Sequence, residues 1–397
     1  MAENKKVMIV DDSALMRRVL CDIISEIDGF EVTKSCRDGV EALQALESKQ
    51  HFDVMVLDVE MPRMDGIRLL MEIQERNIKI TTLMASSYTT ENADITIRCM
   101  ELGAVDFVAK PNNISKLKSD EYKAKLENML LAVADSDISK LNIKRDNQGT
   151  VQDRYDAVMA RVAKHEREKT EEPKTPVNPW RPPVAPGISN QIPVPAVKTA
   201  PGESNRIIAL ACSTGGPKSL QSVIPFLDKA MDAPCVLVQH MPVGFTKSLA
   251  DRLDEISKVK VTEAVDGEVL EKGHVYIAPG GKHLEVSAEA GGVHRIRLNE
   301  NPAIGGLRPC ANIMYKSLVK SKYDEIVCVV LTGMGADGTE GIVELSKSKK
   351  IHVISQDEKS CIVYGMPKAI AETGLPDEIL PLDRIAGAVV KYVGLCR

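Results

Sequence analysis

Little in this sequence points to nucleic acid or to a membrane as the main partner. Aromatic residues make up 4% of the 397 residues, with one tryptophan, so surfaces for stacking nucleic-acid bases are not expected. Acidic residues outnumber basic ones and give a formal net charge of -5, whereas binding to a phosphate backbone usually needs a basic face. No apolar run approaches the roughly 20 residues that span a bilayer. We therefore expect no nucleic-acid partner and no direct insertion into a membrane.

The cysteines indicate neither a disulfide framework nor a metal site. The nine cysteines include no Cys-x-x-Cys pair and no metal-ligand spacing. Six of them lie in apolar or helix-like segments: Cys21, Cys99, Cys212, Cys235, Cys328 and Cys361. Reduced cysteines buried in a core are typical of the cytosol. The first residues, MAENKKVMIVDD, lack the apolar centre of a signal peptide, and we expect a cytoplasmic protein.

The chain is long enough for two domains, and strand-like and helix-like segments alternate in two separate regions. In residues 5–118, five short apolar runs predict strands: VMIV, FEVTKSC, VMVLDV, ITTLMAS and AVDFVAK. Between them lie amphipathic segments such as ALMRRVLCDIISEI and GIRLLMEIQER, whose apolar residues recur at helical spacing. This alternation predicts a right-handed, doubly wound parallel sheet.

A second alternation begins at RIIALAC and continues through CVLVQH, GHVYIAP, EIVCVVLTG and IHVISQ. Between the two regions, residues 119–170 are charged and partly helical, and residues 171–204 are rich in proline, which sustains neither a helix nor a central strand. We predict an α/β protein of two doubly wound parallel-sheet domains, at 1–120 and 205–397, with a linker at 121–204.

Acidic side chains follow two strands of the first domain. Asp11 and Asp12 come directly after VMIV, and Asp58 ends VMVLD. Parallel strand ends converge on one edge of a sheet, where three carboxylates repel one another unless a hard cation such as Mg²⁺ lies between them. Lys110 after the fifth strand offers a cation for a phosphoryl group, and Ser86 after the fourth offers a hydroxyl. Taken alone, Asp58 also fits a simpler role as a strand-end residue that caps a turn.

In this order the residues resemble the receiver domain of two-component response regulators, over about residues 5–118. The resemblance implies a flavodoxin-like fold, with Asp58 as the acceptor of a phosphoryl group from a histidine kinase. It also assigns further residues to the site: Asp11, Asp12 and Asp58 to Mg²⁺, and Ser86 and Lys110 to the phosphoryl group. Phe107 stands where the family carries an aromatic residue that reorients on activation, although a core role also fits this position.

In the second domain, three strands are each followed by a side chain suited to acyl transfer. Ser213 follows RIIALAC at a strand-to-helix bend, where GGP allows a sharp turn and leaves backbone N–H groups free. His240 ends CVLVQH, and Asp337 lies in the glycine-rich loop after EIVCVVLTG. We expect the three side chains to meet at one sheet edge as a Ser–His–Asp set. Singly, they also fit a helix cap, a structural histidine and a phosphate-binding loop, although that loop lacks a P-loop lysine.

The motifs STGG, QHMPVGFT, YIAPGGKH, RPCAN, LTGMGADG and SCIVYGMP follow one another over about residues 205–395. In this order they resemble the chemotaxis protein-glutamate methylesterases, the CheB family, and both domains together resemble its full-length members. The resemblance implies a Rossmann-like three-layer α/β domain that needs no cofactor for ester hydrolysis.

The resemblance also implies a role for each site residue. Ser213 is the nucleophile, His240 is the general base, and Asp337 orients His240. Backbone N–H groups near Thr214 and Met334 form the oxyanion hole, and Arg308 contacts an acidic substrate segment. Cys310 and Asn312 depart from the family, which often has serine and aspartate there.

The function implied by this resemblance is phosphorylation-regulated hydrolysis of glutamate methyl esters on the cytoplasmic domains of chemoreceptors, with deamidation of receptor glutamines by the same chemistry. A histidine kinase and methylated chemoreceptors are the implied partners.

Two alternative functions belong to other classes of protein. A DNA-binding response regulator would need a basic helix-turn-helix effector, which neither charge nor pattern supplies. A catalytically inactive module that only binds receptors or phosphoryl groups is the second alternative, and the complete Ser–His–Asp set argues against it.

Overall fold

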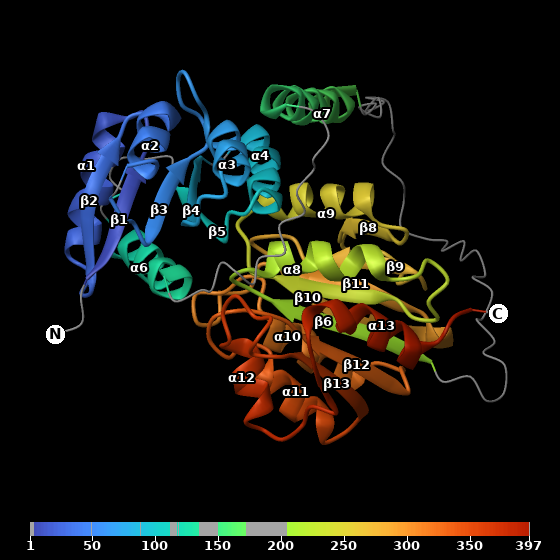
Figure 1. Ribbon diagram of the computed structural model, residues 1–397. Coiled ribbons are helices and arrows are strands. Elements are labelled where there is room, and N and C mark those ends of the chain that lie inside the picture. Colours follow the sequence, from blue (N-terminus) through green and yellow to red (C-terminus); the bar gives the residue numbers. More distant parts are fainter. Residues whose placement is uncertain are drawn as a thin grey trace, which may run out of the picture.

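The computed structural model describes residues 4–48, 50–87, 89–111, 117, 119–134, 150–171 and 205–396, and it contains two α/β domains that contact each other (Figure 1). The amino-terminal domain has a five-stranded parallel sheet with the strand order β2-β1-β3-β4-β5. Its strands are β1 (Lys5–Val10), β2 (Phe30–Cys36), β3 (Val54–Asp58), β4 (Thr81–Ser87) and β5 (Asp106–Lys110). Its helices are α1 (Ala14–Ser25), α2 (Gly39–Leu46), α3 (Gly66–Glu75), α4 (Thr90–Glu101) and α6 (Asp120–Ala134).

Both faces of this sheet are apolar, because successive residues of a strand point to opposite sides. On β1, Met8 and Val10 belong to the core shared with α2, α3 and α4, whereas Val7 and Ile9 belong to the core shared with α1 and α6. Side chains that precede the helices cap their first N–H groups; Ser13 does so for α1 and Asp65 for α3. The predicted doubly wound fold is confirmed for this domain.

The expected boundary at residue 120 needs a correction. Residues 121–134, which we assigned to the linker, form most of α6, and four of its side chains are buried in the core of the amino-terminal domain: Tyr122, Leu126, Leu130 and Val133. Their spacing of three to four residues places them on one face of the helix. Helix α6 therefore belongs to the receiver-like domain. Because the outer face of α6 is charged, the composition of this segment did not indicate that the helix packs in a core.

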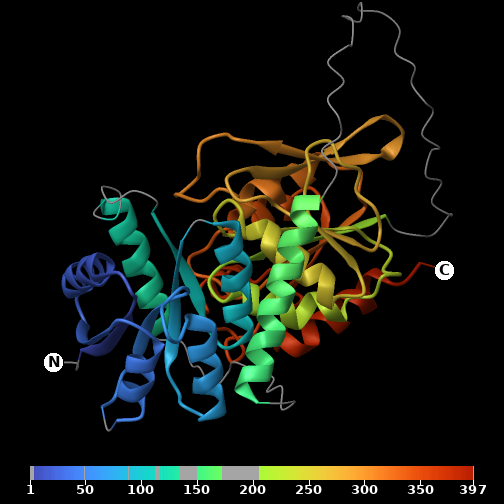
Figure 2. The same cartoon turned by 90° about the horizontal axis from the view of Figure 1, so that it is seen from above.

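A second helix lies within the expected linker. Helix α7 (Val151–Glu171) packs against α3 and α4, and Figure 2 shows it beside these helices. Arg154 pairs with Glu75 at 2.6 Å, and the Tyr155 hydroxyl donates a hydrogen bond to Asp65. The proline-rich part of the predicted linker, residues 172–204, lies outside the described residues.

The carboxyl-terminal domain has a seven-stranded parallel sheet with the order β14-β13-β12-β6-β7-β9-β8 and a separate antiparallel hairpin. The sheet strands are β6 (Arg206–Cys212), β7 (Cys235–Gln239), β8 (Lys260–Glu263), β9 (His274–Ile277), β12 (Glu325–Val330), β13 (Lys350–Gln356) and β14 (Glu378–Leu380), and the hairpin strands are β10 (His283–Ala288) and β11 (His294–Asn299). The helices are α8 (Gly216–Val223), α9 (Phe245–Ile256), α10 (Ala311–Ser317), α11 (Thr339–Ser346), α12 (Met366–Ala371) and α13 (Leu382–Val393), and the 3-10 turns are η2 (Ile224–Phe226), η3 (Ala290–Gly292) and η4 (Leu318–Lys320).

This sheet lies between two layers of helices, which confirms the predicted three-layer arrangement. Ile208 and Leu210 of β6 contribute to one core, together with residues of α8, α9 and α13. Ile207 and Ala209 contribute to the opposite core, together with residues of α10, α11 and α12. All sheet pairings are parallel, so the carboxyl ends of β6, β7 and β12 open on the same edge.

The two domains contact each other through α4 and β5 on one side and α8 and α9 on the other. Helix α4 packs against α9, where Arg98 pairs with Glu255 at 2.9 Å and Glu101 pairs with Arg252. The rings of Phe107 and Phe245 stack across the contact with their centres 4.4 Å apart. The interface therefore combines ion pairs with one aromatic contact, and it lies beside the carboxyl edge of the larger sheet.

Candidate active site and phosphorylation site

Ser213 lies at the sharp turn between β6 and α8, and the backbone around it is held from two sides. Its N–H donates to the Thr332 carbonyl oxygen at 3.0 Å, and its own carbonyl oxygen accepts the Gly216 N–H at 2.7 Å. Gly215 has a φ of +76°, and a Cβ at this residue would lie 2.7 Å from Cβ of Ile362. The turn thus requires glycine at this position, and it presents Ser213 at the carboxyl edge of the sheet.

His240 follows β7 directly and meets Asp337, which comes from the loop between β12 and α11. Nε2 of His240 lies 2.7 Å from Oδ2 of Asp337. Only 9% and 6% of the two side chains are exposed, so water competes little for this contact. Because Nε2 is committed to the carboxylate, Nδ1 is the ring nitrogen that remains for a nucleophile.

Asp337 is held by three further donors at the start of α10. Oδ2 also accepts the Ala311 N–H at 2.6 Å, and Oδ1 accepts the Asn312 N–H at 3.0 Å and the Cys310 thiol at 3.1 Å. Burial acts to raise the pKa of Asp337. The hydrogen bond and the charge of His240, together with the N–H groups of Ala311 and Asn312, act more strongly in the other direction and lower this pKa to about 2. The carboxylate is therefore ionised throughout the neutral range and fixed in orientation.

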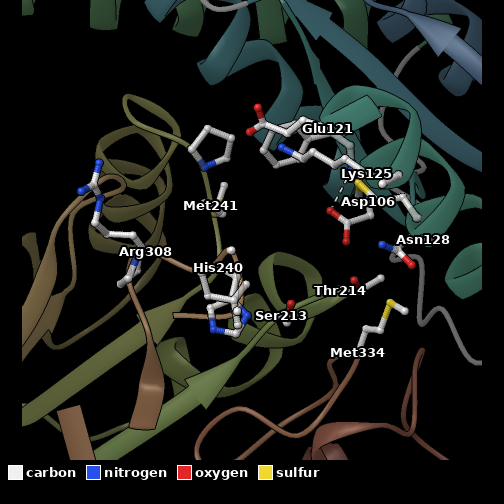
Figure 3. A pocket seen from close by; sticks show the side chains of 18 residues that line it. Asp106, Glu121, Lys125, Asn128, Ser213, Thr214, His240, Met241, Arg308 and Met334 are labelled. Atoms are coloured by element: carbon white, nitrogen blue, oxygen red, sulfur yellow. Dashed lines mark hydrogen bonds between the residues drawn. The ribbon is translucent and has the colours of Figure 1, made fainter. Parts of the chain in front are cut away.

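Ser213 and His240 line one cavity of about 640 Å³, as Figure 3 shows. Within the described part of the chain, the His240 ring hydrogen-bonds to Asp337 and not to Ser213. Hydrogen bonds between a nucleophile and its base often tighten only when substrate is bound. The structure thus places His240 against Asp337 and in the same cavity as Ser213, and the Ser–His–Asp set stays a prediction.

Three other residues expected at this site line the same cavity. Thr214 is buried, whereas Met334 is 42% exposed at the rim. Arg308 donates from Nη1 to the carbonyl oxygens of Glu300 and Asn301 at 2.9 and 3.2 Å. These bonds tie Arg308 to its own loop. The expected roles of Thr214 and Met334 in an oxyanion hole, and of Arg308 in substrate contact, stay predictions.

The other wall of the cavity comes from the amino-terminal domain, and we did not predict it. The side chains that reach the cavity from this domain include Asp106, Glu121, Lys125 and Asn128 (Figure 3). Their presence depends on how the two domains dock, which no local pattern specifies. One signal was available, since Asp106 interrupts the apolar run AVDFVAK and a charged residue inside a buried strand needs a partner.

The acidic residues of the amino-terminal domain lie together at the carboxyl edge of its sheet. Oxygens of Asp11, Asp12 and Asp58 lie within 4.8 Å of one another. Three carboxylates from two adjacent strands form a set of hard oxygen ligands, which suits Mg²⁺. Asp12 is exposed, so the cluster is open to solvent on one side. The residues present therefore fit a divalent cation.

Lys110 bridges two of these carboxylates. Its Nζ lies 2.7 Å from both Asp11 Oδ2 and Asp58 Oδ2. Burial raises the pKa of Asp58 to about 6, although the charge of Lys110 opposes this effect, and the neighbouring Asp11 adds to it. Asp58 also accepts the Val59 N–H at 2.8 Å, which leaves its side chain fixed beside the cation site.

Two residues expected to respond to phosphorylation contact partners outside the acidic cluster. Ser86 accepts a hydrogen bond from the Thr96 hydroxyl of α4 at 2.7 Å, while the next residue, Ser87, lines the cleft around Asp58. Phe107 is 5% exposed and stacks on Phe245 of the other domain. The core role that we kept open for Phe107 therefore includes a contact between the domains.

Comparisons with known proteins agree with both domains. The sequence pattern of the CheB methylesterase matches residues 208–389, and that of the response regulator receiver domain matches residues 7–120. The chain is 40% identical to a protein-glutamate methylesterase/protein-glutamine glutaminase of Geobacillus kaustophilus, across 98% of this chain and 99% of that protein. A protein of the same name from Bacillus subtilis is 38% identical across 98% of each chain. The crystal structure of the Thermotoga maritima CheB methylesterase catalytic domain is 42% identical, covers 48% of this chain and 100% of that one, and has a TM-score of 0.46.

These matches extend over both domains in the same order and over nearly the whole length of the relatives. The methylesterase match occupies the carboxyl-terminal half, where a DNA-binding response regulator would carry its effector domain. Among the helices that the structure describes, none combines the length and the apolar character needed to cross a membrane. The chain belongs to the CheB methylesterase family and carries the response regulator receiver domain at its amino-terminal end.

Proposed function

We propose that this protein is a phosphorylation-regulated protein-glutamate methylesterase that hydrolyses glutamate methyl esters on the cytoplasmic helices of chemoreceptors. The contact of 2.7 Å between Asp337 and His240, which lines the same cavity as Ser213, carries this proposal. Relatives that match nearly the whole chain are named protein-glutamate methylesterase/protein-glutamine glutaminase. We therefore extend the proposal to deamidation of receptor glutamines, which uses the same acyl chemistry.

In the proposed reaction, the Ser213 hydroxyl attacks the ester carbonyl carbon while Nδ1 of His240 takes its proton. Ionised Asp337 holds the imidazole through Nε2 and stabilises its charged form. The tetrahedral intermediate collapses, and methanol leaves with the proton that His240 returns. Water, deprotonated by His240, then releases glutamate from the acyl-serine. Backbone N–H groups near Thr214 and Met334 would stabilise the oxyanion in both steps.

The proposed substrate is an acidic, helical segment of a receptor. Arg308 lines the cavity, and the donors of its guanidinium other than Nη1, which binds its own loop, would contact such a segment. A receptor helix has to reach Ser213 from outside, and the receiver domain now forms one wall of the cavity. Movement of the receiver would therefore widen access for a protein substrate.

We further propose that a histidine kinase phosphorylates Asp58. Asp11, Asp12 and Asp58 would hold Mg²⁺, which supplies positive charge for the incoming phosphoryl group. Lys110 lies where it can pair with a phosphoryl oxygen. A change around Ser86 and Phe107 would then weaken the stacking with Phe245 and release the receiver.

The test is methanol release from methylated receptor, measured with and without a small phosphodonor. Ser213→Ala should lose activity by several powers of ten, because the nucleophile of a triad accounts for most of its rate enhancement. A variant that kept normal methanol release would refute the assignment. An inactive wild-type protein that still bound receptor would favour the alternative of a catalytically inactive module.

Asp58→Ala is the matched variant for regulation. It should keep the basal rate of methanol release and lose stimulation by the phosphodonor, because Asp58 lies in the other domain and touches no group of the cavity around Ser213. Stimulation that survived this change would rule out Asp58 as the acceptor while leaving the esterase assignment intact.

A further inference from the structure

The peptide between Thr214 and Gly215 is held in one orientation by a buried threonine. The Thr332 hydroxyl lies 3.0 Å from the Thr214 carbonyl oxygen and 3.1 Å from the Val363 carbonyl oxygen, so these two acceptors share its one proton, and it accepts the Val363 N–H at 2.9 Å. The backbone N–H of Thr332 donates to Oε1 of Gln356 at 2.8 Å. Thr332 has no exposed surface. The Thr214 carbonyl group is therefore fixed toward the end of β12.

The other side of the same peptide faces the receiver domain. In a trans peptide the N–H and C=O groups point in opposite directions, so the contact with Thr332 turns the Gly215 N–H away from β12. This N–H donates to Oδ2 of Asp106 at 3.3 Å. Asp106 lines the cavity that also holds Ser213. A fixed donor two residues after a nucleophile, at the edge of its cavity, is suited to stabilise negative charge.

Asp106 is a carboxylate that the receiver domain brings to this donor. It is only 6% exposed, and its other oxygen, Oδ1, accepts the Phe107 N–H at 2.8 Å. Burial raises the pKa of Asp106 to about 6, whereas the N–H groups of Phe107 and Gly215, the charge of Lys125 and a hydrogen bond from the Thr214 side chain act in the opposite direction. The surroundings thus combine a high cost of burial with donors that favour the charged form.

We infer that the Gly215 N–H is an oxyanion-hole donor of the esterase site and that Asp106 occupies this donor while the receiver is docked. The inference rests on the proposed function of Ser213. As the bond between Ser213 Oγ and the carbonyl carbon forms, the π electron pair of the carbonyl moves onto its oxygen. The Gly215 N–H stabilises that oxyanion until the pair returns, the bond to the methoxy group breaks, and methanol leaves with a proton from His240.

This arrangement makes the docked receiver an inhibitor of the chemical step as well as an obstacle to entry. The cavity of about 640 Å³ beside Ser213 has room for a small ester even with the receiver in place. A receptor helix would be excluded in any case. Small esters can therefore separate the two effects, because they enter the docked form and still meet an occupied donor.

The first experiment measures hydrolysis of p-nitrophenyl acetate by the full-length chain without phosphodonor. Asp106→Asn should raise the rate about tenfold or more, because the carboxamide has a single acceptor oxygen and cannot serve both Phe107 and Gly215. Glu121→Gln is the control. Glu121 is another receiver carboxylate that lines the same cavity, and its change should alter the rate less than about twofold.

Small-angle X-ray scattering of the same samples reports whether the domains stay docked. A faster Asp106→Asn variant with an unchanged scattering profile supports the inference. An unchanged rate overturns it, and so does a rise that appears only with an expanded profile. Ser213→Ala keeps the two proposals apart. If that variant still hydrolyses the ester at the wild-type rate, the proposed function fails; if it is inactive and Asp106→Asn behaves as wild type, only the present inference fails.

The second experiment tests the part played by Thr332 as a positioning residue. In the phosphodonor-activated enzyme, Thr332→Val should lower kcat for p-nitrophenyl acetate about tenfold or more and leave KM nearly unchanged, because a misaimed donor acts on the transition state. Thr332→Ser keeps the hydroxyl and should restore most of kcat. Equal kcat for the valine and serine variants, with both folded by circular dichroism, would overturn this part of the inference.

Discussion

Cys310 is the unusual member of the group of donors that holds Asp337. Burial raises the pKa of its thiol to about 11, and the charge of Asp337 acts in the same direction. The sulfur therefore keeps its proton and donates it to Oδ1 of the carboxylate. A thiol is a weak donor, and the N–H groups of Ala311 and Asn312 hold the same carboxylate. The contribution of Cys310 to catalysis should thus be real but small.

We predict that Cys310→Ala lowers kcat for methanol release about fivefold, which corresponds to the loss of one hydrogen bond of about 1 kcal/mol. Cys310→Ser should keep kcat within about twofold, because a hydroxyl replaces the thiol as a donor. Cys36→Ala, a change of a buried cysteine in the receiver, is the control for general effects of losing a thiol. Wild-type activity in Cys310→Ala would show that the backbone donors alone position Asp337.

Side chains that directly follow buried strands could be placed from the sequence, because parallel strand ends share an edge. This principle brought Ser213, His240 and Asp337 to one site on the strength of three apolar runs. It could not supply Asp106 or Thr332. Asp106 reaches the site only through domain docking, and Thr332 is recognisable only from the path of its hydroxyl hydrogen bonds.

At the scale of single elements, α6 is the sharpest test of the domain boundary. Leu126 of this helix has no exposed surface and packs in the receiver core, whereas its neighbour Glu127 is exposed. Leu126→Ala should lower the free energy of unfolding by about 2–4 kcal/mol, because it leaves a cavity in a packed core. Glu127→Ala should leave it nearly unchanged. Urea unfolding followed by circular dichroism measures both values, and a Leu126→Ala variant as stable as wild type would return these residues to the linker.

Elements with strong periodic patterns could be predicted, and those with weak ones could not. All five strands of the receiver lie at the expected apolar runs, as do β6, β7, β9, β12 and β13. The edge strands β8 (Lys260–Glu263) and β14 (Glu378–Leu380) are short and partly exposed, so they lack a continuous apolar run. Helical structure was expected in the region of α6, but its packing on the receiver core was not, because α6 buries one narrow stripe and exposes charge elsewhere.

At the scale of the whole molecule, the position of one domain on the other could not be predicted from either half alone. The contact combines exposed and half-buried charges, such as Arg98 with Glu255, and a stacked pair of rings, Phe107 with Phe245. Ion pairs near a surface contribute little each and are screened by salt. An interface of this kind can be released by a modest change in one partner, which fits the role proposed for phosphorylation.

The larger domain should lose stability in mild acid, because it buries neutral histidines. Burial lowers the pKa of His294 to about 4, with the charge of Lys322 adding to the effect, and the ring accepts the Lys322 N–H at 2.9 Å. A folded-state pKa below the unfolded value of about 6.5 means that this stability is present above pH 6.5 and is lost as the pH falls toward 4. At pH 5 the loss from His294 should be about 2 kcal/mol.

His294→Gln, whose side-chain oxygen can accept the same N–H, should therefore show a smaller drop in urea stability between pH 7 and pH 5 than wild type. His51→Gln, at an exposed histidine of the receiver, should show the wild-type drop. Equal drops in all three proteins would mean that His294 is charged in the folded state or exchanges with water far more freely than its burial implies.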